Sequence, residues 1–406
     1  MANVKFFFAI TLICFKFSAL NAQNTNKLYQ NDVIHVGAER LTTYLPLLKN
    51  KNVGMVVNQT SIIERTQTSI VDTLLRLGIT IKKIFAPEHG FRGKADAGEH
   101  IENTVDAKTG VPIVSIYGKK HAPNETDLKN IDVLVFDIQD VGVRFYTYIS
   151  TLEYLMVACA QNKKPLIILD RPNPNGHYVD GAVLNKTYKS FIGMQSIPIV
   201  YGMTIGEYAT MLNGEKWLAD NAKCDLTVIT CENYSHTSFY KLPVNPSPNL
   251  PNMKAIYLYP SLCFFEGTDV SCGRGTNKQF QIYGSPNIKP SKASFTFTPR
   301  PNEGAKDPYL NGKLCYGKDL STLTITQLQR MKKIDMSFLI AAYTHYTPKD
   351  SFFLKSNFFE KLAGTDNLRQ QIKDKKCEKD IKKSEQKGIE DFKKIRKKYL
   401  LYPDFK

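Results

Sequence analysis

Short apolar segments that alternate with helical patterns are the feature that most limits the folds open to this chain. The clearest of these segments are Asn52–Val57, Thr80–Ala86, Val133–Ile138, Pro165–Leu169 and Leu226–Thr230. Each ends abruptly in polar residues, Pro or Gly, as strands of a parallel sheet do when helices cover both faces of the sheet. The intervening helical patterns are Ser69–Leu77, Thr151–Cys159 and Thr204–Leu212, the last with Thr204 as its expected N-cap. The first half of the chain is therefore predicted to be α/β, a doubly wound, mostly parallel, Rossmann-like sheet.

The chain is long enough for a second domain. A Pro/Asn-rich connector, Pro243–Pro251, separates the α/β half from a weakly patterned α+β half. We place a Rossmann-like domain at 23–242 and a smaller α+β domain at 243–406. The first strand is not followed by G-x-G-x-x-G, and a Walker A pattern is absent from the sequence, so neither a dinucleotide nor any other cofactor is expected.

The first residues have the pattern of a signal peptide. A Lys-bearing start, an apolar run from Phe6 to Ala19 and small residues up to Ala22 precede Gln23. We expect residues 1–22 to be removed and the mature protein to be exported, to a periplasm or beyond the cell. No later stretch is apolar and long enough for stable insertion in a membrane.

The net charge of +16 raises the question of an anionic partner. Much of the excess lies between Lys373 and Lys398, where lysines alternate with acids and with apolar residues at helical spacing. This pattern predicts an amphipathic helix with a solvated basic face, and nucleic acid is not expected as a partner of an exported protein. The sequence makes no prediction of an oligomeric state.

Acids and arginines follow several of the predicted strands. Ligands bind at the carboxyl ends of strands in open α/β sheets, so these side chains are the candidates for a site. Glu88 is the foremost candidate. It comes just after a predicted strand, where Pro87 before it and Gly90 after it stop the strand and turn the backbone. The simpler alternative is a polar turn in which Glu88 and Arg92 form a solvated ion pair. The other candidates of the first half are His89, Arg92, Asp137, Gln139, Asp140, Arg144, Asp170, Arg171 and Asn173.

Two of these positions leave alternatives open. Asp137 stands within an apolar strand, where an unpaired charge is costly, so an ion pair with Arg144 or Arg171 is as good an interpretation as catalysis. His89 lies near Asp96 and His100, but their spacing matches no common metal motif and no metal is expected. In the second half, Glu266 and Arg274 bracket a glycine-rich loop that permits close approach to a ligand.

Five segments in this order resemble the NamZ-type exo-β-N-acetylmuramidases, a family long described as a domain of unknown function. The segments are PEHGFRG (Pro87–Gly93), DIQDVGVRFYTY (Asp137–Tyr148), DRPNPNG (Asp170–Gly176), PSPNLP (Pro246–Pro251) and EGTDVSCGRGT (Glu266–Thr276). The resemblance extends from about Val53 to Tyr402. It implies a Rossmann-like domain that carries the catalytic Glu, here Glu88, and a smaller C-terminal domain that closes the cleft.

The resemblance also implies a reaction, the release of β-1,4-linked N-acetylmuramic acid from non-reducing ends of peptidoglycan fragments. Glu88 would be the general acid, while Asp137, Asp140 or the acetamido group of the substrate would take the opposing role. Arg144, Arg171 or Arg274 would bind the lactyl carboxylate of the muramyl sugar. Two alternatives from other classes are a wall-fragment binding protein without catalysis and a metal-dependent hydrolase built around His89 and Asp137.

Overall fold

The computed structural model describes residues 33–88, 90–92 and 104–405. The predicted signal peptide, His89, Asp96 and His100 lie outside these residues. From residue 35 onward the chain forms one compact unit, which contains both the large sheet and the smaller one described below.

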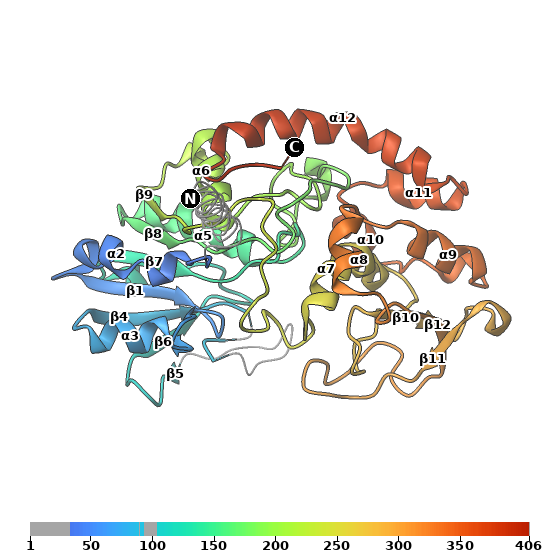
Figure 1. Cartoon of the computed structure of the whole chain (residues 1–406), viewed down its shortest axis with the longest axis horizontal. Helices are drawn as coiled ribbons and strands as arrows, with labels where there is room; N and C mark the ends of the chain where they lie inside the picture. The colour runs from blue at the N-terminus through green and yellow to red at the C-terminus, as the bar shows by residue number, and fades with distance from the viewer. Residues whose placement is uncertain (1–32, 89, 93–103, 406) are drawn as a thin grey trace, which may run out of the picture. The chain divides into compact units, whose positions relative to one another are not determined.

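The central sheet has seven strands in the order β5-β6-β4-β1-β7-β8-β9 (Figure 1). All neighbouring pairs are parallel except β5 and β6, which pair at the edge in the antiparallel sense. The strands are β1 (Asn52–Val57), β4 (Thr80–Ala86), β5 (Thr104–Val105), β6 (Pro112–Ser115), β7 (Val133–Asp137), β8 (Leu166–Leu169) and β9 (Leu226–Ile229), and a small hairpin adds β2 (Ile62–Ile63) and β3 (Thr68–Ser69). The order from β6 to β9 is that of a Rossmann fold, so the predicted fold class is confirmed.

The helices of this half follow the predicted pattern closely. They are α2 (Leu41–Leu48), α3 (Ile70–Arg76), α4 (Glu125–Leu128), α5 (Tyr148–Gln161) and α6 (Ile205–Gly214), with the 3₁₀ turns η1 (Gly37–Glu39), η2 (Lys186–Tyr188) and η3 (Ala219–Asn221). Thr204 caps α6 as predicted, because its side chain accepts from the backbone of Glu207 and the Glu207 carboxylate accepts from the Thr204 backbone. Helix α5 begins earlier than predicted, at Tyr148.

The second half contains a separate three-stranded antiparallel sheet, in the order β10-β12-β11. Its strands are β10 (Ile282–Ser285), β11 (Phe295–Phe297) and β12 (Cys315–Asp319). The helices beside it are α7 (Met253–Leu262), α8 (Ile325–Met331), α9 (Ser337–His345), α10 (Phe358–Ala363) and α11 (Asn367–Lys373), with the 3₁₀ turns η4 (Cys263–Gly267), η5 (Pro290–Lys292) and η6 (Lys349–Ser351). The second half is therefore α+β, as predicted, while the boundary at 242/243 stays a prediction.

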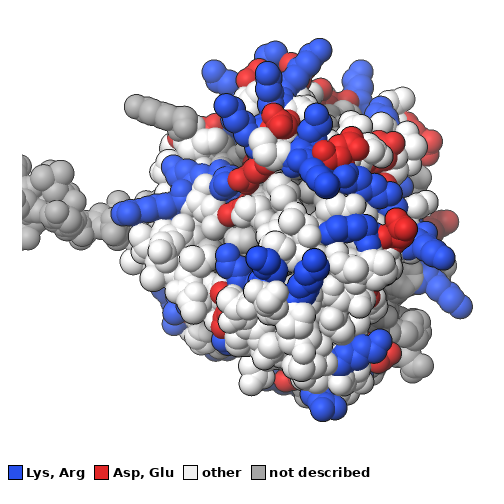
Figure 2. Space-filling model, turned by 90° about the vertical axis from the view of Figure 1, so that its right-hand side faces the viewer, with Lys and Arg blue, Asp and Glu red and all other residues white. Residues whose placement is uncertain are grey.

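The basic segment near the C-terminus forms α12 (Glu378–Arg396), followed by η7 (Lys397–Tyr399). Ile381, Ile389 and Phe392 are buried on one side of α12, and its lysines are mostly exposed. Figure 2 shows Lys and Arg gathered toward the end of the molecule where Figure 1 places α11 and α12. The predicted amphipathic helix is confirmed. Among the helices described, none is both long and apolar enough to cross a membrane.

Candidate functional site

Glu88 lies just beyond the carboxyl end of β4, where Pro87 ends the strand. Its half-buried carboxylate accepts hydrogen bonds from two side chains: the Tyr117 hydroxyl donates to Oε1 at 2.8 Å, and Thr147 Oγ1 donates to Oε2 at 3.2 Å. The hydroxyl of Tyr148 donates to the backbone oxygen of Glu88 at 3.3 Å. Tyr117 follows β6, and Thr147 is the N-cap residue of α5. Side chains that follow β6 and precede α5 therefore fix this carboxylate at the carboxyl ends of the strands.

A cavity of about 180 Å³ opens beside Glu88 and is lined by both halves of the chain. Of the described residues that line it, Glu88, Glu266 and Arg274 are charged, and Thr147, Ser247 and Asn249 add uncharged polar groups. The aromatic residues that line it are Tyr117, Phe145, Tyr146, Phe191, Tyr259 and Phe280. Aromatic faces beside a few polar groups are typical of ligand sites, and they suit the apolar faces of a sugar ring.

Glu266 and Arg274 form an ion pair on the wall of this cavity that the second half provides. Arg274 Nε donates to Glu266 Oε1 at 2.6 Å, and the two side chains are 27% and 22% exposed respectively. Burial opposes a charge on Arg274, but the Glu266 carboxylate more than offsets that effect and raises the pKa of Arg274. The guanidinium also lies over the ring of Phe280, at 5.2 Å from its centroid. Arg274 is thus a fixed cation that remains partly accessible.

The glycines next to Arg274 explain the conformation of the glycine-rich loop, for which the sequence predicted close approach to a ligand. Gly273 and Gly275 have φ values of +87° and +74°, a conformation that other residues rarely adopt. A Cβ atom at Gly275 would lie 2.6 Å from the side chain of Pro308. The loop therefore folds tightly against its neighbours, which holds Arg274 in place.

Asp137 and Arg171 form a buried ion pair and do not line the cavity. Arg171 Nε donates to Asp137 Oδ1 at 2.6 Å and Nη2 donates to Oδ2 at 3.0 Å, while Nη2 also reaches the backbone oxygen of Ile62 at 2.9 Å. Burial disfavours the charge of Arg171, yet the facing carboxylate outweighs it and raises the pKa of Arg171. Of the two interpretations of Asp137, the structure contains the ion pair, and its partner is Arg171.

Arg144 is completely buried and takes no part in lining the cavity. Its Nη1 donates to the backbone oxygens of Ala182 and Ile197, both at 2.8 Å, and its Nη2 donates to that of Leu362 at 3.0 Å. Burial lowers the pKa of Arg144 to about 9. The side chain connects the segment after β7 to α10 of the second half.

The remaining candidates from the strand ends form a buried polar framework under the site. Asp140 accepts from the hydroxyl of Tyr201 and from the backbone of Gly142. Asp170 accepts from Thr204 Oγ1 at 2.7 Å and from the hydroxyl of Tyr402 at 2.6 Å. Burial raises the pKa of each of these carboxyls to about 6.

Two amide side chains brace the same framework. Gln139 Nε2 donates to the backbone oxygens of Asp140 and Pro172, both at 2.8 Å. Asn173 Nδ2 donates to the backbone oxygen of Met203 at 2.8 Å. Neither residue lines the cavity. Both instead fix the backbone that follows β7 and β8.

Arg92 forms an ion pair with Asp106, whereas the sequence suggested an ion pair with Glu88. Its guanidinium binds Asp106 through Nη2 and Oδ2 at 2.8 Å and approaches Asp72 at 3.6 Å. His89 lies outside the described residues. Within the described ranges, His, Cys, Asp and Glu side chains do not gather in threes as metal ligands would.

Several residues of the cavity were not predicted from the sequence. Tyr117 and Thr147, which hold Glu88, and Tyr259 and Phe280, which face it from the second half, are uncharged. A search restricted to acids, arginines and histidines passes over them. Tyr117 ends the apolar run Val111–Tyr117, and that position was the signal that could have identified it.

Comparisons with known proteins agree with this architecture. Residues 53–254 match the family model "Exo-beta-N-acetylmuramidase NamZ, N-terminal", and residues 257–402 match its C-terminal counterpart. A curated relative from Bacillus subtilis (strain 168), "Peptidoglycan beta-N-acetylmuramidase NamZ", is 35% identical over 95% of this chain and 95% of its own length.

Two crystal structures of DUF1343 family proteins from Bacteroides fragilis NCTC 9343 have the same fold. One is 48% identical, with a TM-score of 0.85, and covers 92% of this chain and all of its own. The other is 28% identical, with a TM-score of 0.75, and covers 91% of this chain and 99% of its own. With both family models matched along nearly the whole compact unit, this chain belongs to the NamZ family.

Proposed function

We propose that this protein is an exo-acting glycoside hydrolase that releases β-1,4-linked N-acetylmuramic acid from the non-reducing ends of peptidoglycan fragments. The family membership and the muramidase from Bacillus subtilis support this activity. The observation that carries it in this chain is the position of Glu88, whose carboxylate is held by Tyr117 and Thr147 at a small cavity rich in aromatic residues.

Glu88 is the proton donor for the leaving glycosidic oxygen in this proposal. A general acid must be fixed within reach of the bond that it protonates, and both carboxylate oxygens of Glu88 are fixed by hydroxyl groups. Glu88 lines the cavity, and its partial exposure leaves it open to a bound sugar.

The acetamido group of the substrate is the best candidate for the role opposite Glu88, the attack on the anomeric carbon. Asp137 is engaged on both oxygens by Arg171, and Asp140 is buried beneath Tyr201 and Gly142, so both are poorly placed to activate a water molecule at the cavity. Glu266 lines the cavity but is paired with Arg274. The acetamido oxygen needs no further carboxylate from the protein, because it can attack the anomeric carbon itself.

Arg274 is the best of three arginines for the lactyl carboxylate. Arg144 and Arg171 are buried and bound to backbone oxygens or to Asp137. Arg274 lines the cavity, and its Nε is bound to Glu266, which leaves the planar guanidinium oriented for a bidentate contact with a carboxylate. This contact would distinguish a muramyl from a glucosaminyl residue.

Proton NMR of the cleavage of a β-linked muramide tests the proposal and reports the anomeric outcome at the same time. We expect release of muramic acid by the wild type and a loss of roughly 10²–10⁴-fold in Glu88→Gln, the usual contribution of general acid catalysis. Glu125→Gln, on the exposed first turn of α4, is the matched control and keeps full activity. Binding of the muramide without any release of sugar by the wild type would favour a wall-fragment binding protein instead, and loss of activity in chelator would favour a metal-dependent hydrolase.

We also propose that residues 1–22 are a signal peptide and that the protein acts outside the cytoplasm. The charged start, the apolar run and the small residues before Gln23 support this localisation. Mass spectrometry of the protein from the periplasmic fraction should give a mature chain that begins at Gln23. An intact N-terminus in the cytoplasmic fraction would contradict the proposal.

A further inference from the structure

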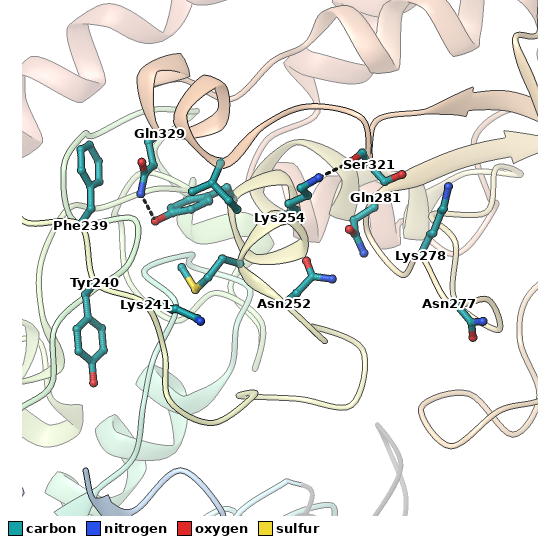
Figure 3. Close-up of a pocket in the computed structure, with 13 residues that line it drawn as sticks. Phe239, Tyr240, Lys241, Asn252, Lys254, Asn277, Lys278, Gln281, Ser321 and Gln329 are labelled. Atoms are coloured by element: carbon teal, nitrogen blue, oxygen red, sulfur yellow. Dashed lines mark hydrogen bonds between the residues drawn. The ribbon is translucent and has the colours of Figure 1, made fainter. Parts of the chain in front are cut away.

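A second cavity, of about 640 Å³, is lined by residues close in sequence to those of the candidate active site (Figure 3). Lys278 and Gln281 line this cavity, while Phe280 between them lines the catalytic one. On α7, Tyr257 faces this cavity while Tyr259 faces the catalytic one. Its volume falls within the roughly 300–1,000 Å³ of small-molecule sites. The reaction proposed above makes no use of it.

Among the residues that the structure describes, the charged groups on the walls of this cavity are all cations: Lys241, Lys254 and Lys278 line it, and no Asp or Glu does. Lys254 is half-buried, and its ammonium group donates to the backbone oxygen of Ser321 at 2.5 Å (Figure 3). Lys278 binds Asp319, which lies behind the wall, at 2.5 Å. Lys241 is exposed. The cavity is therefore complementary to an anion.

The rest of the lining combines apolar and amide groups. Phe239 is 51% exposed, a large value for an aromatic side chain, and Tyr257 is oriented by the Gln329 amide, which donates to its hydroxyl at 3.1 Å. Met253 and Ile325 add apolar surface, and further amides lie at Asn252, Asn277 and Gln281 (Figure 3). A ligand that fits these walls carries carboxylates, amide groups and small apolar groups together.

We propose that this cavity binds the acidic peptide stem of peptidoglycan, carried by a muramyl residue beyond the one that is cleaved. This inference rests on the proposed function, because the catalytic cavity would hold the terminal sugar of the same fragment. N-acetylglucosamine is neutral and has no carboxylate that could pair with the lysines. The stem supplies carboxylates for the lysines, peptide groups for the Asn and Gln side chains and alanyl methyl groups for the apolar wall.

Calorimetry with a free stem tetrapeptide, L-alanyl-γ-D-glutamyl-diaminopimelyl-D-alanine, tests the site without the reaction. We expect the wild type to bind it at millimolar concentration or better, and Lys241→Glu to weaken binding by about tenfold, equivalent to about 1.4 kcal/mol. Lys254→Gln, which keeps a donor toward Ser321, should weaken it less, and Lys241→Arg should restore it. Lys51→Glu, a charge reversal at another exposed position, is the matched control and leaves binding unchanged.

Turnover separates this inference from the proposed function. Lys241→Glu should raise KM for a saccharide that carries a peptide stem and leave KM and kcat for the stem-free saccharide within about twofold of wild type. Failure of the wild type to cleave the stem-free saccharide would refute the proposed function, while the binding of the tetrapeptide would still stand. No binding of the tetrapeptide, or equal weakening by Lys241→Glu and Lys51→Glu, would overturn the stem site.

Discussion

Tyr117 and Glu88 occupy corresponding positions beyond two paired strands, and a hydrogen bond of 2.8 Å joins the hydroxyl of Tyr117 to Oε1 of Glu88. In the parallel register of β4 and β6, Ala86 pairs with Ser115. Glu88 and Tyr117 each lie two residues beyond this pair. The sheet itself thus brings the phenol to the carboxylate. This relationship makes Tyr117 a positioning residue for the proposed general acid.

Tyr117→Phe is expected to lower kcat by roughly 10–100-fold, because the carboxylate loses one of the donors that fix it and a small misplacement is costly in catalysis. KM should change little, since the ring that lines the cavity is retained. Steady-state kinetics on a muramide would measure both constants. Tyr316→Phe in β12, which removes a hydroxyl away from the cavity, serves as control. A purely structural role for Tyr117 would instead lower the melting temperature and leave kcat unchanged.

Arg274→Ala should reduce kcat/KM for muramyl substrates by about 10–100-fold, in line with the roughly 1.5–3 kcal/mol of a hydrogen bond to a charged group. The matching glucosaminyl substrate lacks the lactyl carboxylate, so its lower rate should be nearly unaffected. Arg274→Lys keeps the charge but loses the planar fork and should give an intermediate value. Equal losses on both substrates would mean that Arg274 supports the fold of the loop rather than selecting the sugar.

Arg144→Ala is predicted to destabilise the protein by about 3 kcal/mol or more, since it removes the Arg144 donors to the backbone oxygens of Ala182 and Leu362 and one of the two donors to that of Ile197. Urea unfolding followed by circular dichroism would measure the loss. The ratio of activities on muramyl and glucosaminyl substrates should stay at the wild-type value in whatever fraction remains folded. A change of that ratio without a loss of stability would contradict the structural role.

The sequence was enough to predict the large sheet, because buried parallel strands are nearly continuous apolar runs with sharp ends. Asn52–Val57 and Thr80–Ala86 match β1 and β4 residue for residue. The small sheet was harder to predict: β10 and β12 are short, contain glycine and have no clear alternation of apolar and polar residues. Their pairing depends on contacts distant in the sequence.

The candidate site shows a similar division. Glu88, Glu266 and Arg274 were predicted and line one cavity, although their roles stay a proposal. Asp140 and Arg144 follow the same kind of strand end but are turned into the interior. Spacing along the chain shows that a polar side chain follows a strand, but it does not show whether the side chain faces the ligand or the core.

Glu385 on α12 should make the stability of the protein depend on pH. Burial raises the pKa of its carboxyl to about 7, from an ordinary value of 4.5. The charged groups around it are Lys382, with Nζ at 3.7 Å from Oε2, and Asp180 and Arg144 from the first half. The native state therefore keeps a proton that the unfolded chain releases above pH 4.5.

Because the folded protein binds more protons than the unfolded chain in this window, the contribution of Glu385 to stability falls as the pH rises from 4.5 to about 7 and is constant above that. Glu385→Gln removes the ionisation, so the variant should gain on the wild type by roughly 3 kcal/mol across the same window. Urea unfolding at a series of pH values would measure the gain. Glu390→Gln, exposed on the same helix, should follow the wild type at every pH. If the free energies of unfolding of Glu385→Gln and wild type changed in parallel with pH, folding would not raise the pKa of the Glu385 carboxyl, and the prediction would be wrong.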